Sequence, residues 1–122
     1  MIKRLPTHCG DDTCPSCVAA GDFIFLAHHA GGFDKLNITH QMRAAFESIK
    51  NTLSLVGATL DDMVQINLYM KDLSGFSEAR DVFYEYFKSE SFPARMSLSS
   101  DFLSPSCLCM IDGVAYKPGA GE

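Results

Sequence analysis

One arginine, Arg95, is the residue of this sequence best suited to holding an organic acid. It follows Pro93, which disfavours a helical conformation for Phe92, and it precedes residues 96–99, where apolar side chains and serines alternate. That alternation predicts a half-buried β-strand with Arg95 at its start. A guanidinium group fixed there could bind a carboxylate through two parallel hydrogen bonds. The alternative is that Arg95 forms an ion pair at the surface or at a subunit interface.

A second candidate site lies near the N-terminus, where three cysteines and a histidine occur close together. Its members are His8, Cys9, Cys14 and Cys17. Four such side chains could bind zinc, although zinc sites usually draw their ligands from two separated pairs. Cys14 and Cys17 could instead form a redox pair, but a reactive Cys-x-x-Cys usually opens a helix, and the residues after Cys17 predict a strand. Ordinary loop thiols are the remaining alternative.

Two adjacent histidines, His28 and His29, follow a continuous apolar run over residues 23–27 and precede Gly31 and Gly32. A continuous run of this length predicts a strand that is covered on both faces. Binding residues are frequent in the loops at strand ends, so the two histidines are candidates for a binding corner. A polar strand end without a chemical role is the alternative.

The composition limits the class of protein. The chain has 122 residues, which predicts one domain over residues 1–122. A hydrophobic fraction of 47% and a net charge of −5 are typical of a globular protein and argue against a basic nucleic-acid-binding surface. No apolar run is long enough to span a membrane, and residues 1–6 lack the apolar core of a secretory signal. We therefore expect a cytoplasmic protein with mostly reduced cysteines and no nucleic-acid or membrane partner.

Apolar periodicity and turn residues predict six strands and two helices that would position these side chains. The expected strands cover residues 2–5, 16–20, 22–27, 63–70, 95–99 and 107–116. The first helix is expected to start at a cap on Asn37 or Thr39 and to end at Gly57, and the second to start at Ser74. Arg80 is expected to be a solvent-facing charge of the second helix. Residues 1–15 are otherwise expected to be irregular, and residues 117–122 to form a flexible tail.

This order of elements predicts an α+β fold, a mixed sheet with both helices on one face. The strict alternation of residues 63–70 places Gln65, Asn67 and Tyr69 on the other face, and we expect the serines of the Arg95 strand to lie there too. A semi-polar face that the chain's own helices leave uncovered indicates contact with other subunits. We therefore expect a homo-oligomer.

Several motifs occur together in an order that is known from one family. They lie in residues 21–25, 41–43, 58–62, 64–73, 84–87, 92–95 and 111–115, and they include a Lys-Asp pair and a Pro-Ala-Arg signature. In these motifs the sequence resembles the reactive-intermediate imine deaminase family, the RidA/YjgF-type proteins, which are also called endoribonuclease L-PSP-like. The resemblance covers most of the chain, from about Val18 to Tyr116.

The resemblance implies a chorismate-mutase-like α+β subunit of the bacillary type, assembled as a homotrimeric barrel with ligand clefts between subunits. In the family the Pro-Ala-Arg arginine holds the carboxylate of a 2-imino or 2-enamino acid, and a glutamate on the last strand is thought to position the hydrolytic water. The products are a 2-keto acid and ammonia. By position Arg95 would bind this carboxylate partner, and neither a cofactor nor a metal is expected.

The sequence departs from the family at the position of that glutamate, which is occupied by Met110. A thioether cannot accept a proton as a carboxylate does. Asp112 lies two residues further on, so in a strand it points to the same face, and it corresponds to the family's second acidic position. We therefore expect Arg95 and Asp112 to be the catalytic residues if the protein is an enzyme.

The resemblance also assigns positions to the substrate pocket, and most of them are changed. The family's pocket tyrosine falls near Cys14, its pocket cysteine at Ser97, and its Ser-Gly pair at Ala27 and His28. Together with Arg95, His29 and Met110, these are the expected substrate-binding residues.

Three hypotheses for function remain open at this level. The first is an imine deaminase in which Arg95 anchors the substrate and Asp112 or His28 is the base. The second is a trimer that binds a small carboxylate without catalysis, because Met110 replaces the glutamate. The third is a thiol or zinc function at Cys9, Cys14 and Cys17.

Overall fold

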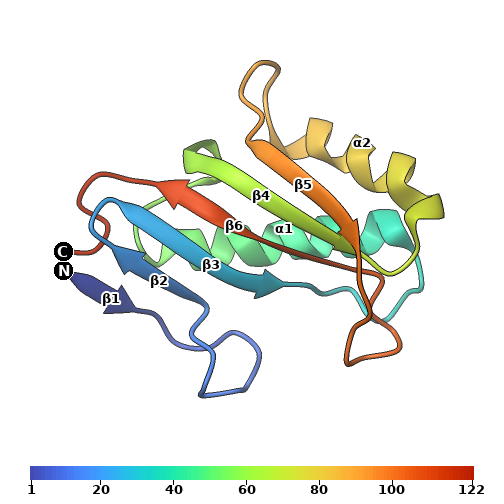
Figure 1. The fold of residues 1–122 in the computed structure, drawn as a ribbon, viewed down its shortest axis with the longest axis horizontal. Helices are drawn as coiled ribbons and strands as arrows, with labels where there is room; N and C mark the ends of the chain where they lie inside the picture. The colour runs from blue at the N-terminus through green and yellow to red at the C-terminus, as the bar shows by residue number, and fades with distance from the viewer.

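The computed structural model describes residues 1–122, and its six strands form one sheet in the order β1-β2-β3-β6-β4-β5 (Figure 1). The elements are β1 (Ile2–Arg4), β2 (Cys17–Ala20), β3 (Phe23–His29), α1 (Ile38–Ser54), β4 (Met63–Met70), α2 (Phe76–Tyr86), β5 (Ala94–Ser99) and β6 (Cys109–Tyr116). Strands β4 and β5 are parallel, and all other neighbours are antiparallel. The predicted mixed sheet of an α+β fold is therefore confirmed.

Helix α1 begins and ends through local contacts that the sequence encodes. The Asn37 side chain accepts a hydrogen bond from the backbone N–H of His40, which caps the first turn. After the last helical residue, Ser54, Gly57 adopts a left-handed conformation with φ 72°, which closes the helix end. Helix α2 differs from the prediction at its start, because a short 3-10 turn capped by Asp72 precedes it.

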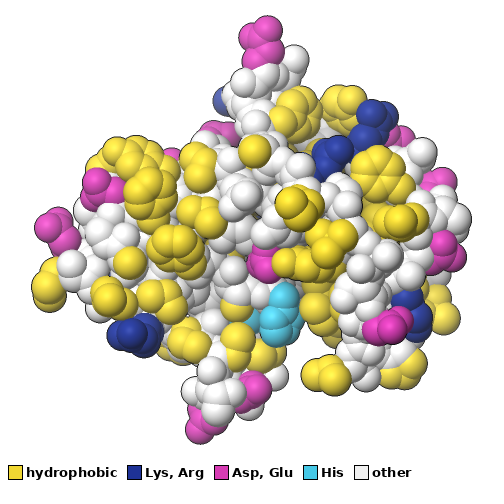
Figure 2. Space-filling model, in the orientation of Figure 1, with side chains coloured by type: hydrophobic (Ala, Val, Ile, Leu, Met, Phe, Trp, Pro, Cys, Tyr) yellow, Lys and Arg dark blue, Asp and Glu magenta, His cyan; other side chains and the backbone are white.

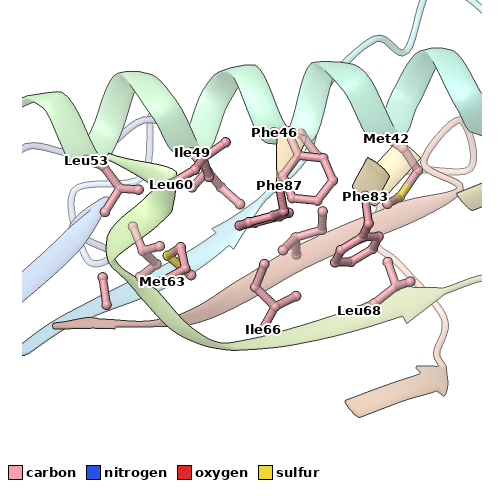
Figure 3. Close-up of a cluster of buried hydrophobic side chains, with 14 of the residues drawn as sticks. Met42, Phe46, Ile49, Leu53, Leu60, Met63, Ile66, Leu68, Phe83 and Phe87 are labelled. Atoms are coloured by element: carbon pink, nitrogen blue, oxygen red, sulfur yellow. The ribbon is translucent and has the colours of Figure 1, made fainter. Parts of the chain in front are cut away.

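The hydrophobic core lies between one face of the sheet and the two helices (Figure 3). Helix α1 lies against β6 and β3, and its apolar residues spaced by three or four belong to the same buried cluster as alternate residues of β4, as the two periodicities predict. The fully buried members of these two rows are Met42, Phe46, Ile49, Leu53, Ile66, Leu68 and Met70. In Figure 1, α1 passes behind the strands and α2 lies beyond the edge strand β5, and both helices contribute to the one core cluster.

Strand β5 is turned over relative to the prediction. In its parallel register with β4, Arg95 lies beside Ile66 and Ser97 lies beside Leu68, so both point to the helix side of the sheet. The prediction that the serines share the opposite face with Asn67 was wrong. The strand lies at the sheet edge, beyond the well-covered core, so polar side chains can occupy its helix side, and the apolar Met96 lies on the opposite face, beside Asn67.

The sheet face away from the helices, called here the open face, is largely apolar (Figure 2). Phe23, Phe25 and Met96 expose 44%, 49% and 61% of their surface there. Gln65 and Asn67 lie on the same face, as predicted. An exposed face that is rich in apolar side chains is characteristic of a surface that another protein covers.

The C-terminal residues 117–122, expected to be flexible, are held against the turn between β2 and β3. The backbone N–H of Lys117 donates to the carbonyl of Asp22, and that of Gly121 to the carbonyl of Gly21. Ala120 is only 6% exposed. The small residues that resemble a linker in sequence allow the tail to lie close to this turn, beside the N-terminus (Figure 1).

Neither helix has the length and hydrophobicity that a membrane-spanning helix requires.

Candidate functional site

Arg95 is exposed to solvent, and its contacts within the chain leave much of its guanidinium group unpaired. Its Nε donates a hydrogen bond to Ser97 Oγ over 3.0 Å. Its guanidinium carbon lies 5.2 Å from the ring centroid of Phe83 and 5.6 Å from that of Phe76. No carboxylate of the chain forms an ion pair with it. The two Nη groups, which form the fork that fits a carboxylate, are therefore available to a ligand.

Arg95 opens onto a small pocket between α2 and β5. The pocket has a volume of about 140 Å³ and is lined by Arg80, Phe83, Tyr84, Phe92 and Arg95. Its members come from the helix, from the chain that enters β5 and from β5 itself. The sequence identified Arg95 but placed Arg80 in solvent. Residues three and four apart share a helix face, so the spacing of Arg80, Phe83 and Tyr84 could have predicted that these side chains line one surface of α2.

Asp112 lies on the open face and is held by two side chains of β4. Asn67 Nδ2 donates to Asp112 Oδ1 over 2.8 Å, and the Tyr69 hydroxyl donates to Oδ2 over 2.9 Å. Burial and the hydrogen bond to Asp112 raise the pKa of Tyr69, so its hydroxyl keeps its proton and remains the donor. A carboxylate has about four acceptor positions, so Asp112 can still accept a hydrogen bond from a water molecule.

Met110 lies on the same face as Asp112, as the two-residue spacing predicts. In the antiparallel register Asp112 is beside Asn67, and Met110 is beside Tyr69. Asn67 and Tyr69 were not predicted to be site residues. Their alternation in the neighbouring strand is the signal that could have placed them next to Asp112.

Ala27 and His28 also lie near Asp112, because β3 is irregular at this point. The pairing with β6 passes from Leu26 opposite Gly113 to His29 opposite Ile111. Ala27 and His28 are therefore the two residues that face the single residue between them, Asp112, in the manner of a β-bulge. His28 is exposed. Figure 2 shows a histidine and an acidic side chain near the centre of the open face, surrounded by hydrophobic side chains.

His29 lies in the core and does not belong with the site residues. Strand β3 runs two residues further than predicted and turns this side chain toward α1. Its Nδ1 donates to the carbonyl of Ala27 over 2.7 Å, and its Nε2 accepts from the Thr52 hydroxyl over 2.8 Å. Burial lowers the pKa of His29 to about 4, so the ring is neutral at pH 7. With both nitrogens bonded inside the protein, His29 has no group left for a ligand.

The N-terminal cysteines do not form a metal site. No group of three or more histidine, cysteine or acidic side chains is close enough to hold a metal ion. Cys17 is buried in β2, whereas Cys14 is only partly buried in the preceding loop. Cys9 is exposed, and its hydrogen bond with Thr7 at 3.3 Å lowers the pKa of its thiol. The geometry therefore gives no support to the zinc hypothesis.

The predicted site residues lie on opposite faces of the sheet within one chain. Arg95 and Ser97 point to the helix side at the sheet edge, whereas Met110, Asp112 and His28 belong to the open face. Strand β4 separates β5 from β6. A ligand held by Arg95 of one chain therefore cannot also contact Asp112 of the same chain across the sheet.

Comparison with known proteins identifies the family. The model of the endoribonuclease L-PSP family matches residues 16–117. A RutC family protein of Pyrococcus horikoshii is 34% identical over 106 residues, which cover 82% of this chain and 83% of that protein. A 2-iminobutanoate/2-iminopropanoate deaminase of Dermatophagoides farinae is 28% identical over 87 residues, covering 66% and 67% of the two chains.

A solved structure shows the same fold. The protein comes from Streptococcus pyogenes and is described as a member of the highly conserved yjgF family. It superposes with a TM-score of 0.86 at 30% sequence identity, covering 96% of this chain and 97% of that one. The chain therefore belongs to the endoribonuclease L-PSP family, the RidA/YjgF-type proteins.

Proposed function

We propose that this protein binds a 2-imino acid through Arg95 and hydrolyses it to the 2-keto acid and ammonia. The observation that carries the proposal is the fixed position of the Arg95 guanidinium, with its Nη groups free and no acidic partner in the chain. A relative that matches two thirds of the chain is named a 2-iminobutanoate/2-iminopropanoate deaminase, and its substrates carry the carboxylate that such a guanidinium fits.

The hydrolysis needs a water molecule beside the C=N bond. The water oxygen adds to the imine carbon, the nitrogen takes up protons, and the C–N bond breaks to release ammonia and leave the 2-keto acid. Asp112 has free acceptor positions that can orient this water and take its proton, and His28 is the second candidate base. Met110 offers no such acceptor.

The proposal includes a homotrimer with clefts between subunits. Two observations support an assembly. The open face is apolar and exposed, and Arg95 and Asp112 lie on opposite faces of one sheet. A cleft between two chains can combine Arg95 of one subunit with Asp112 of another.

The test is the release of 2-ketobutyrate from freshly generated 2-aminocrotonate, compared with the spontaneous rate in buffer. We expect acceleration by the wild-type protein and a loss on the order of 100-fold in kcat/KM for Arg95→Gln, since the substrate carboxylate loses its charged hydrogen-bond partner. Arg95→Lys keeps the charge but not the planar fork, so we expect it to recover little activity. A wild-type rate equal to that of buffer would remove the deaminase proposal.

Met110 favours a second candidate, a trimer that binds 2-keto acids without catalysis. For this function, 2-ketobutyrate would raise the melting temperature of the wild type, as ligand binding to the folded state requires, without any turnover of 2-aminocrotonate. The shift would disappear in Arg95→Ala. If no carboxylate changes the melting temperature, this candidate fails too.

A further inference from the structure

Two arginines share the pocket at the edge of the sheet, and no acidic residue lines it. Arg80 reaches it from α2 and Arg95 from β5. Both side chains are exposed to solvent, and the chain as a whole carries a net charge of −5, so two cations that line one small pocket contrast with the rest of the molecule. Their mutual repulsion is relieved when an anion occupies the pocket.

The other contacts of Arg80 are weak. Its Nη2 lies 3.4 Å from Asp81 Oδ1, and the two side chains expose 47% and 65% of their surface. An exposed pair of this kind contributes at most about 1 kcal/mol, so Asp81 does not hold the guanidinium against a competing ligand. The Arg80 guanidinium carbon lies 5.8 Å from the ring centroid of Tyr84, a second lining residue, which directs it along the pocket wall.

Arg95 alone satisfies one carboxylate, because its two Nη groups bind both oxygens in parallel. Arg80, which lines the same pocket from α2, is then a second cation that this carboxylate does not need. The pocket volume of about 140 Å³ corresponds to roughly five water molecules at about 30 Å³ each, so it fits a small organic acid.

We propose that Arg80 binds a second carboxylate of the ligand, so that this protein selects 2-imino and 2-keto acids that are dicarboxylic. The inference rests on the proposed function, in which Arg95 holds the first carboxylate. Phe83 and Phe92 also line the pocket and would contact the short carbon chain of the ligand.

The test compares pairs of keto acids that differ only in a terminal carboxylate. One pair is 2-ketoglutarate and 2-oxopentanoate, and the other is oxaloacetate and 2-ketobutyrate. We expect calorimetry to show that wild-type protein binds each dicarboxylic acid at least about tenfold more tightly than its partner, as one added charge-assisted contact predicts. In Arg80→Gln this preference should disappear, while the affinity for the monocarboxylic acids stays within about twofold.

Lys88→Gln is the matched control, because it also removes one exposed positive charge but lies outside the pocket. It should keep the full preference, and all variants should have the melting temperature of the wild type. Equal affinity for the two members of each pair in the wild type, or a preference that survives in Arg80→Gln, would overturn the role of Arg80 and leave the proposed function intact. Failure of all four acids to bind would also overturn the role of Arg80, and the release of 2-ketobutyrate from 2-aminocrotonate would decide the proposed function separately.

Discussion

The conformation of the Arg95 side chain is restricted by its neighbours in the chain. A free arginine side chain loses about 2 kcal/mol of rotamer entropy when it is fixed, and this loss weakens binding. Here Ser97 and the rings of Phe76 and Phe83 already restrict the side chain, and only Nε is used in doing so. Ser97 occupies the position of the family's pocket cysteine, and its hydroxyl accepts a hydrogen bond from Arg95 Nε.

Ser97→Ala tests this positioning role. The variant removes the acceptor of the Arg95 Nε hydrogen bond without touching the ligand-binding Nη groups. A net hydrogen bond contributes about 0.5–1.5 kcal/mol, so we expect affinity for 2-ketobutyrate to fall roughly threefold to tenfold. Ser99→Ala in the same strand, whose hydroxyl forms no hydrogen bond to Arg95, is the control and should bind as the wild type does. The role is rejected if titration calorimetry gives both variants the same affinity.

At the scale of the elements, His29 joins β3 to α1. Its two ring nitrogens bond the Ala27 carbonyl in its own strand and the Thr52 hydroxyl in the helix, and its ring stacks on His8 of the N-terminal loop at 4.0 Å. The sequence suggested a binding corner because the pair His28-His29 precedes two glycines. The extra residue in the strand turns His28 outward and His29 inward, so the two neighbours have different roles.

The buried His29 makes stability depend on pH. Its pKa is lowered to about 4 in the folded state, mainly by burial, from 6.5. The unfolded chain therefore binds a proton that the folded chain does not, and stability is fully present above about pH 6.5 and is lost as the pH falls toward 4. By about pH 5 the loss amounts to about 2 kcal/mol.

Urea unfolding at about pH 7.5 and about pH 5 measures this loss. In His29→Gln, which has no titrating ring, the difference between the two pH values should be smaller by about 2 kcal/mol. His8→Gln is the comparison variant, because His8 lies beside His29 and lowers its pKa through charge repulsion. An equal pH dependence in the wild type and His29→Gln would show that the ring does not stay neutral in the fold.

The sequence predicts which side chains of a strand face the core only when one face of the strand packs in the core and the other does not. In residues 63–70 the apolar row of Ile66, Leu68 and Met70 faces the core as predicted, whereas a register shift between Met63 and Gln65 leaves Val64, which the alternation assigned to the same row, 47% exposed. In β5 the apolar and serine rows also alternate, but the strand lies at the edge, where neither row packs in the core. The alternation alone therefore assigned the serines to the wrong face. Arg80 was missed for a related reason, since an exposed helix position shows no sign of the strand that approaches it in space.

At the scale of the whole molecule, the main feature is the division of the site residues between the two faces of the sheet. Arg95 and Arg80 line a pocket at the helix side of the edge, whereas Asp112 and His28 belong to the apolar open face. In the proposed function, one chain supplies Arg95 for the acid at one place and Asp112 for the water molecule at the other. The proposed activity therefore depends on assembly, and the exposed Phe25 and Met96 provide surface that an assembly would bury.

Because the proposed activity combines groups from two chains, two inactive variants should restore activity when they assemble together. An Arg95→Gln subunit still carries Asp112, and an Asp112→Asn subunit still carries Arg95. After co-expression and random mixing, roughly one quarter of the junctions would receive both intact groups from different chains, and turnover of 2-aminocrotonate should return to a similar fraction. Each variant alone, and the two proteins purified separately and assayed without subunit exchange, should stay near the background rate. A double variant with both changes on one chain, co-expressed with wild type, also gives one intact junction in about four, which supplies the matched reference.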